Sequence, residues 1–480
     1  MEYESFMKTG SKNKTRSILI NLLLVCLSLS PLLLAEVYLR FTDYGYVDRL
    51  FTLNKETNQY VLNKQLYQKY FPVDPLVKKS RLPLLFHDKK FNAEKSETVF
   101  RIFCLGGSTT EGDLSDASFP DLLQETLSHS EVGKKIEVIN LGFTTLNSYQ
   151  VADFVAEIVD YDPDLLVLYT GHNEIYGPLG VASGSQISSS YSLTTTVLSL
   201  QKFRLFQLLQ NFYLKFLEID TDEDRTKALF RVMAKSEVPP HSPLREKALQ
   251  YFSFNLDKII KQTKKNNIPL IMSTVDSNIR DFRPFDSAVP TGDIAPKWES
   301  LINSARSLAD RSRYSDAKIK FQEAINLFPD NAQQYYDLGQ IYLKFKEYDL
   351  AQEAFIKAKD LDIIPFRAPS GINRIIREKA AEANINLLDI EKIYERNSRA
   401  GIVGKPIMVE HLHPSAYGHY LIAVGLTNII FETGLLKPEK KIDFTDPEVR
   451  ESFKVKINSE KFDKISMWPF HINNKEYRFP

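Results

Sequence analysis

The chain has 480 residues and a mass of 55.2 kDa, which is too long for one ordinary domain. Hydrophobic residues make up 43% of it, enough for a sizeable core. Its 61 basic and 61 acidic side chains cancel without forming a basic stripe, which argues against nucleic acid as a partner. The two cysteines, Cys26 and Cys104, lie in an apolar N-terminal run and in a predicted buried strand, so we expect no disulfide between them.

The N-terminal region predicts a membrane anchor. The run from Ser17 to Ala35 carries no charge, and at about 1.5 Å per residue it nearly spans a ~30 Å hydrocarbon core. Basic side chains precede it, which favours an inside N-terminus and an outside body. They are Lys8, Lys12, Lys14 and Arg16. We therefore expect a tail over residues 1–16 and a single-pass anchor over residues 17–37. A cleaved signal peptide and a buried soluble helix are the alternatives.

After a polar and aromatic stretch at 38–97, expected as a stalk or cap, short apolar runs alternate with helical patterns. Helical spacing occupies 118–129 and 148–161, and 191–219 reads as a further helical insertion. Five runs have the length and continuous apolarity of strands buried on both faces. They are Thr98–Gly106, Lys135–Gly142, Pro163–Gly171, Asn267–Val275 and Asn384–Ile390. The alternation predicts an α/β fold with a parallel sheet flanked by helices.

A repeat interrupts this pattern between the fourth and fifth predicted strands. Four residues recur 34 positions later. They are Tyr314, Ala317, Phe321 and Ala324, matched by Tyr348, Ala351, Phe355 and Ala358. The second copy also contains Leu338 and Gly339 at the expected spacing. The pattern resembles a pair of tetratricopeptide repeats over 297–362, which implies an all-α insertion that binds a protein partner. A plain helical hairpin is the alternative.

A serine on a glycine bend follows the first predicted strand, in "CLGGSTTEG" (104–112). Such a serine can belong to a phosphate-binding loop, cap a helix or act as a nucleophile. A phosphate-binding loop requires a lysine that is missing here. A nucleophilic serine requires a base, and three of the eight histidines fall in "EHLHPSAYGH" (410–419). With Ser415 as a helix N-cap, His413 lies on the loop entering that helix, and Glu410 can reach its ring.

Two further strands end in residues suited to binding an oxyanion. The second predicted strand ends at Gly142, and the third ends in Gly171-His172-Asn173. Ligands of parallel sheets gather at the carboxyl ends of the strands, so these turns and Ser108 are expected at one crevice. The backbone N–H groups of Ser108 and Gly142 and the Asn173 amide can then stabilise a developing oxyanion.

Four segments together resemble, in order, the signature blocks of the SGNH (GDSL-type) hydrolase family. They are "FCLGGSTTEG", "EVINLGFTTLNSYQ", "YDPDLLVLYTGHNEIYG" and "VEHLHPSAYGHYLIA". The resemblance implies a hydrolase domain in two parts, 98–296 and 363–437, followed by an extension at 438–480. It also implies Ser108 as nucleophile and oxyanion donor, Gly142 and Asn173 as further donors and His413 as base. Two positions depart from the family: Gly107 stands in place of the first aspartate, and Glu410 in place of the closing one.

The resemblance implies a serine esterase that needs no cofactor and no metal. Relatives at the cell envelope act on O-acetyl groups, so an acylated carbohydrate or lipid is the expected substrate. The body is expected on the periplasmic side of a bacterial cytoplasmic membrane. An O-acyltransferase using the same residues is one alternative, and a catalytically idle scaffold is another. A further alternative for the segment 410–419 is a metal site formed by Glu410, His411, His413 and His419.

Overall fold

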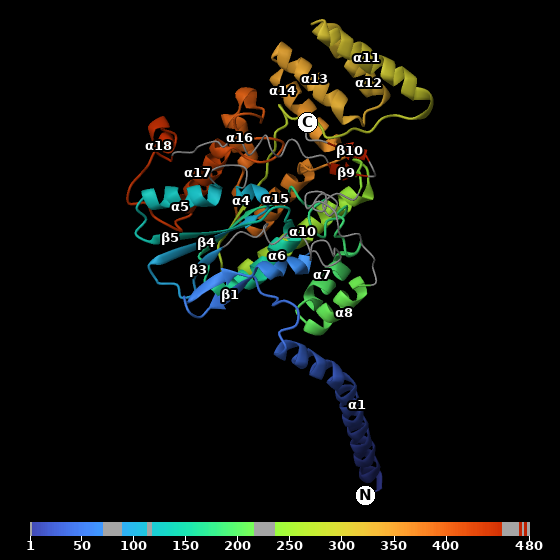
Figure 1. Cartoon of the computed structure of the whole chain (residues 1–480), viewed down its shortest axis with the longest axis vertical. Helices are drawn as coiled ribbons and strands as arrows, with labels where there is room; N and C mark the ends of the chain where they lie inside the picture. The colour runs from blue at the N-terminus through green and yellow to red at the C-terminus, as the bar shows by residue number, and fades with distance from the viewer. Residues whose placement is uncertain are drawn as a thin grey trace.

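The computed structural model describes residues 2–70, 89–112, 118–215, 236–453, 470–472 and 475–477. Its centre is a five-stranded sheet in the order β5-β4-β6-β7-β8, with every neighbouring pair parallel (Figure 1). The strands are β4 (Val99–Gly106), β5 (Lys135–Gly142), β6 (Leu165–Tyr169), β7 (Leu270–Ser273) and β8 (Asn386–Leu388). Each lies within one of the five apolar runs, which confirms the predicted α/β sheet.

Helices cover both faces of this sheet, which explains why its strands are apolar almost throughout. On one face pack α5 (Phe119–His129), α16 (Ile390–Asn397) and α17 (Ala416–Glu432). On the other face pack α6 (Ser148–Ile158), α10 (Pro243–Lys265) and α15 (Ser370–Ala383). Peripheral elements are α18 (Pro447–Ser452) and the antiparallel pair β9 (Phe470–Ile472) and β10 (Lys475–Tyr477). All residues of β6 and β7 are buried, so both helical layers exclude water from the sheet.

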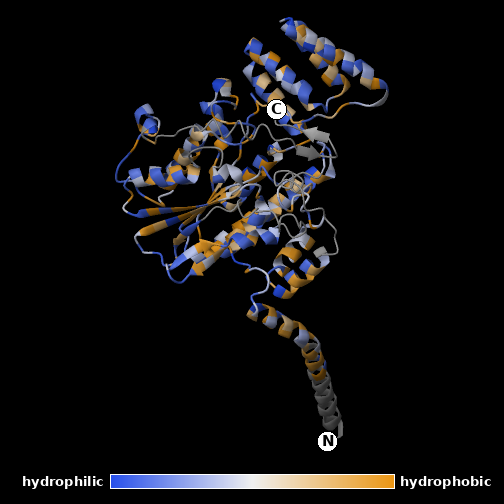
Figure 2. Cartoon of the chain, in the orientation of Figure 1, coloured by the Kyte–Doolittle hydropathy of each residue, from blue (hydrophilic) through white to orange (hydrophobic). Residues whose placement is uncertain are grey.

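The N-terminus forms one long helix, α1 (Glu2–Phe41), which projects from the body (Figure 1). The expected anchor at 17–37 lies on this helix, and apolar colouring marks the described part of it (Figure 2). The side chains of residues 1–19, 22 and 25 lie outside the described part of the chain. In the described part of the chain, no helix combines the length and the apolarity needed to cross a membrane.

The described part of the segment after α1 packs onto the body. It contains a small antiparallel sheet of β1 (Phe51–Asn54), β2 (Gln59–Leu62) and β3 (Lys90–Asn92). The short helix α2 (Tyr67–Tyr70) lies between β2 and β3 in the chain. Arg101, a buried residue of β4, donates to Glu137 at 2.6 Å and to the backbone oxygens of Asn92 and Tyr161 at 2.8 Å. Its guanidinium also lies 4.8 Å from the Phe91 ring centroid. A buried cation therefore joins the small sheet to the main one.

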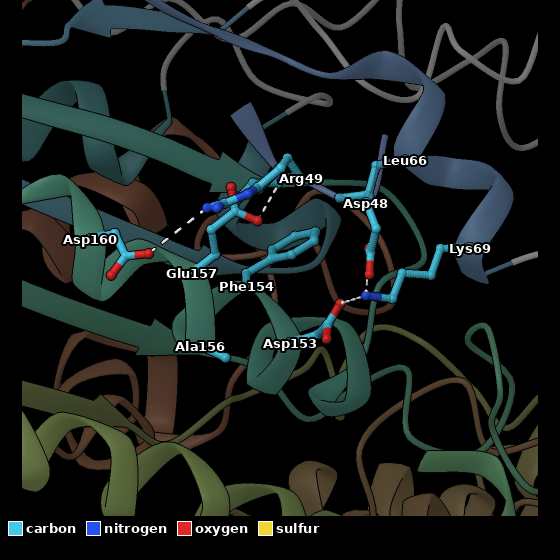
Figure 3. Close-up of a pocket in the computed structure, with 10 residues that line it drawn as sticks. Asp48, Arg49, Leu66, Lys69, Asp153, Phe154, Ala156, Glu157 and Asp160 are labelled. Atoms are coloured by element: carbon cyan, nitrogen blue, oxygen red, sulfur yellow. Dashed lines mark hydrogen bonds and ion pairs between the residues drawn. The ribbon is translucent and has the colours of Figure 1, made fainter. Parts of the chain in front are cut away.

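A group of charged side chains holds the same segment against α6 (Figure 3). Lys69 contacts Asp48 at 2.7 Å and Asp153 at 2.8 Å, and only 7% of its side chain is exposed. Burial alone would lower the pKa of Lys69, but the two carboxylates raise it above its usual value. Glu157 accepts the Leu50 amide N–H at 2.8 Å. The surrounding pocket of about 220 Å³ is thus lined by ion pairs that fasten the chain.

Four helices form the insertion between β7 and β8. They are α11 (Ala295–Asp310), α12 (Tyr314–Leu327), α13 (Ala332–Phe345) and α14 (Tyr348–Leu361). The helices pack in sequence, and α12 and α14 begin at the equivalent tyrosines of the 34-residue repeat. A side chain at Gly339 would approach the Phe355 ring to 2.7 Å, so glycine permits the close approach of α13 and α14. The insertion lies at the end of the body opposite α1 (Figure 1).

Candidate active site

Ser108 lies where β4 turns into the short helix α4 (Ser108–Glu111). Glycine is required before it, because a Cβ on Gly106 would overlap the Tyr169 carbonyl and one on Gly107 would come 2.8 Å from Asn173 Nδ2. Gly107 occupies the N-cap position, so Ser108 is the first helical residue and does not cap the helix. The serine hydroxyl therefore sits half-buried at the carboxyl edge of the sheet.

His413 meets Ser108 across this edge. The distance from Ser108 Oγ to His413 Nε2 is 2.7 Å, although the residues are 305 positions apart. The histidine lies on the loop before α17, and Ser415 caps that helix by accepting the Gly418 N–H at 3.2 Å. This cap is the one predicted from the sequence. Its geometry turns the chain at Pro414 and holds His413 beside the serine.

Glu410 completes the group. Its Oε1 contacts His413 Nδ1 and accepts the backbone N–H groups of His413 at 2.7 Å and Leu412 at 3.2 Å. Its Oε2 contacts Nδ1 of His411. A carboxylate at Nδ1 holds the proton on that nitrogen, which leaves Nε2 free to accept the Ser108 proton. The structure thus brings together Ser108, His413 and Glu410 in the order that a serine nucleophile requires.

The expected oxyanion donors differ in their availability. Asn173 donates one amide hydrogen to the Leu146 carbonyl at 2.9 Å and retains a second one. The Ser108 N–H has no hydrogen-bond partner within the described residues. The Gly142 N–H, however, donates to Asn140 Oδ1 at 2.9 Å. The two donors at the serine and asparagine turns are therefore open to a ligand, and the glycine amide is already engaged.

Gly142 has a packing role instead. A Cβ at this position would overlap the backbone of Thr110 and Glu111, so glycine lets α4 lie directly on β5. Sequence reasoning missed Thr145, three residues later, whose φ of 73° is unusual for a β-branched residue. Its turn lies against the Asn173 turn, since a Cβ on Gly177 would reach both Thr145 O and Asn173 O at 2.6 Å. No residue type in this stretch signals that conformation.

The other histidines near the site are buried and neutral. Burial lowers the pKa of His172 and of His419 to about 3. Burial and then the proximity of His413 hold the pKa of His411 well below its ordinary value. The His411 ring packs among Phe282 and Phe285, with ring centroids 5.4 and 5.2 Å away. These three histidines are buried near His413, whereas the side chain of His413 itself is partly exposed.

The possibility of a metal ion can be tested on the donor atoms. Ligand atoms of Glu410, His411 and His413 lie within 4.8 Å of one another, a spacing that can hold an ion. Both oxygens of Glu410 already contact imidazole nitrogens, and His413 Nε2 faces Ser108. His419 stacks on Phe119 and is not in the group. The four-residue cluster considered from the sequence is therefore not assembled, and the donors fit a proton relay better.

A buried ion pair supports the loop behind the histidines. Arg367 donates to the carbonyls of Asn278 at 3.0 Å and Phe282 at 2.9 Å, and it pairs with Asp362 at 3.4 Å. The Asn278 N–H in turn donates to the His411 carbonyl at 2.9 Å. Asp362 directly follows α14 of the insertion. A chain of polar contacts thus runs from the insertion to the residue beside Glu410.

No family model and no curated protein matches the chain. Solved structures with a similar chain fold include a lipase/acylhydrolase from Enterococcus faecalis, with 13% identity, coverage of 71% of this chain and 100% of that one, and a TM-score of 0.31. A GDSL-like lipase from Bacteroides thetaiotaomicron has 10% identity, coverages of 72% and 93%, and a TM-score of 0.30. A variant of an acetyl-xylooligosaccharide esterase from Geobacillus stearmophilus has 10% identity, coverages of 72% and 97%, and a TM-score of 0.33. The reaction proposed below is therefore argued from the geometry of Ser108, His413 and Glu410.

Proposed function

We propose that this protein is a serine esterase of the SGNH type. The observation that carries the proposal is the 2.7 Å separation of Ser108 Oγ and His413 Nε2, with Glu410 at the other ring nitrogen. Serine alone is a weak nucleophile at neutral pH, and an adjacent base oriented by a third group is the arrangement that activates it. Ser108 is half-buried and not fully enclosed at the carboxyl edge of the sheet, and the proposal requires an ester to reach its hydroxyl there.

The reaction would proceed in two steps. Ser108 Oγ attacks the carbonyl carbon of the ester while His413 Nε2 takes the proton of the Ser108 hydroxyl. The carbonyl oxygen of the ester then becomes an oxyanion. The Ser108 N–H and the Asn173 amide stabilise that charge. The tetrahedral intermediate expels the alcohol, which receives the proton from His413. Water then attacks the acyl group on Ser108, with His413 again as base, and releases the carboxylic acid.

The substrate that best fits this proposal is an O-acyl group, such as O-acetyl, on envelope carbohydrate or lipid. The uncharged run from Ser17 to Ala35, with basic side chains before it, is the support for a single-pass anchor over residues 17–37 and for a body on the extracytoplasmic side. If a sugar hydroxyl replaces water in the second step, the same residues make an O-acyltransferase. The acyl-enzyme is common to both reactions, so only the acceptor distinguishes them.

We further infer that the helical insertion at 297–362 is a pair of tetratricopeptide repeats that recruits a protein partner. Support comes from the equal 34-residue spacing of α12 and α14 and from small residues where the helices touch. The competing function is a scaffold in which the insertion binds its partner and the hydrolase fold does no chemistry.

Labelling of the full chain with a fluorophosphonate tests the proposal. We expect one covalent adduct on Ser108, lost in Ser108→Ala and in His413→Ala but retained in Ser128→Ala, an exposed serine on α5. Absence of labelling in a folded protein would favour the scaffold. The products formed from an acetyl ester in the presence of a sugar acceptor are then identified by mass spectrometry. This distinguishes the esterase from the O-acyltransferase, because only the transferase yields an acetylated sugar.

A further inference from the structure

Two helices joined by a short turn, α7 (Tyr191–Leu200) and α8 (Arg204–Lys215), follow the third-strand turn, and α8 packs against α1 (Figure 1). The pair α7 and α8 with the turn between them is called the hairpin below. The α8 helix buries two polar side chains and exposes three apolar ones, while Leu205, Phe206 and Leu208 are half-buried. Arg204 and Gln207 are 7% and 2% exposed, whereas Leu209, Phe212 and Tyr213 are 59%, 61% and 61% exposed. A helix on a globular surface has the opposite arrangement.

The buried polar side chains have a clear structural purpose. Gln207 accepts the Tyr46 N–H at 3.0 Å and donates to the Tyr46 carbonyl at 3.1 Å. Tyr46 Oη donates to Gln201 at 2.9 Å, and Asn211 donates to Tyr44 Oη at 3.0 Å. Rotating α8 to bury its apolar face would break these hydrogen bonds to the turn after α1. The outward position of the apolar side chains is therefore fixed by the fold.

The α1 and α8 helices are also joined by hydrogen bonds. Glu36 of α1 accepts the backbone N–H groups of Arg204 at 3.0 Å and Leu205 at 2.8 Å, so its carboxylate satisfies the first amides of α8. Arg40, on the next turn of α1, donates to the Lys202 carbonyl at 2.9 Å. The hairpin is thus held at the level where α1 leaves the body.

The exposed apolar side chains of α8 lie on a helix that packs against α1, which exposes apolar side chains too. On the described part of α1, large apolar side chains are exposed repeatedly from Ile20 to Phe41, and Phe41 itself is 86% exposed. Orange colouring marks both helices in Figure 2. Exposed apolar side chains gathered on adjoining helices mark a protein or membrane contact. The packing of α8 against the helix of the proposed anchor favours the lipid bilayer as the occupant.

The margin of the hairpin fits a bilayer surface as well. Phe203 is 40% exposed, and the Lys202 ammonium lies 5.1 Å from its ring centroid. Lys202 and Lys258 line one groove of about 440 Å³ beside α7. Aromatic rings and lysines whose stems lie along apolar surface are typical of the headgroup region, where the ammonium groups face lipid phosphates.

We propose that the α7–α8 hairpin docks on the bilayer surface, with Leu209, Phe212 and Tyr213 in the boundary between headgroups and acyl chains. The inference rests on the proposed anchor and goes beyond it. A single helix leaves the body free to rotate about the anchor, whereas a second contact fixes which side faces the membrane. The active site and the helical insertion would then have a defined orientation above the bilayer.

The experiment places an environment-sensitive fluorophore on single cysteines of the full chain in phosphatidylcholine–phosphatidylglycerol vesicles. Cys104 is buried and Cys26 is exposed, so the unaltered chain labels on α1. Phe212→Cys in a Cys26→Ser background reports on α8. Ile319→Cys in the same background, 53% exposed on α12, is the matched control. We expect spin-labelled lipids to quench the labels at Cys26 and Phe212→Cys at least about twofold more than the control label.

The outcomes separate the inference from the anchor on which it rests. Quenching at Cys26 without quenching at Phe212→Cys would leave the anchor and overturn hairpin docking. Absence of quenching at both positions would remove the anchor and the docking together. A blue-shifted Phe212→Cys label that lipids do not quench and that reverts on protein dilution would identify a second copy of the chain instead. Leu209→Cys replaces Phe212→Cys if the latter lowers the unfolding temperature.

Discussion

Glu410 divides its two carboxylate oxygens between two imidazoles, one reactive and one buried. The contact to His413 fixes the tautomer and stabilises the imidazolium that forms when Ser108 loses its proton. The contact to His411 and the two backbone N–H groups hold the carboxylate in place.

We expect Glu410→Gln to lower kcat for ester hydrolysis by about 10²–10⁴-fold, because an amide neither stabilises the imidazolium nor fixes the tautomer. Steady-state kinetics measure the effect, and the exposed Glu382→Gln on α15 serves as control. An unchanged kcat would show that Glu410 only supports the loop.

Asn173 and Gly142 are expected to behave differently although both were predicted oxyanion donors. Asn173→Ala should lower kcat by about 10²–10³-fold with little change in KM, because its free amide hydrogen acts on the transition state. Gly142→Ala should lower the unfolding temperature, because its Cβ overlaps α4. A fully stable Gly142→Ala with the kinetics of Asn173→Ala would return the donor role to Gly142.

At the scale of elements, the strands could be predicted because burial on both faces leaves a continuous apolar run. The Ser108–His413 pairing also followed, since Ser108 comes directly after a strand at the carboxyl edge and the Ser415 cap places His413 on the loop entering α17. The sequence left open whether 38–97 is a stalk or a cap, because the burial of Arg101 and Lys69 depends on partners far along the chain. The hydrogen bond from the Gly142 amide to Asn140 could not be predicted, because it depends on the side-chain conformation of Asn140.

The pair Arg367–Asp362 joins the end of α14 to the loop behind His411. Arg367→Ala leaves a buried carboxylate without its cation and should lower the free energy of unfolding by about 3–5 kcal/mol. Urea denaturation measures this, and Arg374→Ala, whose side chain is 62% exposed, should change it by less than about 0.5 kcal/mol. Equal effects of the two variants would contradict a supporting role for the pair.

Across the whole molecule, α1 with its hairpin and the helical insertion lie at opposite ends of the sheet (Figure 1). The insertion is not a detachable appendage, because its core includes Ile279 and Ile402 of the hydrolase body. Tyr336 and Gln340 of α13 also donate to the Arg280 carbonyl at 3.0 and 2.9 Å. A partner bound to the insertion would therefore be held on the side away from the proposed membrane.

Replacement of 297–361 by a Gly/Ser linker should accordingly lower the unfolding temperature, because it uncovers apolar side chains of the body. Calorimetry of the full chain and the shortened chain measures the difference. An unchanged unfolding temperature would show that the insertion folds independently of the body.

The central claim is tested most directly by comparing the losses of activity of the Ser108 and His413 variants. If the two residues act as one unit, removing the second costs little more activity once the first is gone. The measurement is kcat/KM for an activated acetyl ester with Ser108→Ala, His413→Ala and the double variant. We predict a loss of at least about 10³-fold for each single variant and a nearly equal loss for the double variant. Multiplicative losses, or single variants with the full activity of the parent chain, would contradict a shared serine–histidine mechanism.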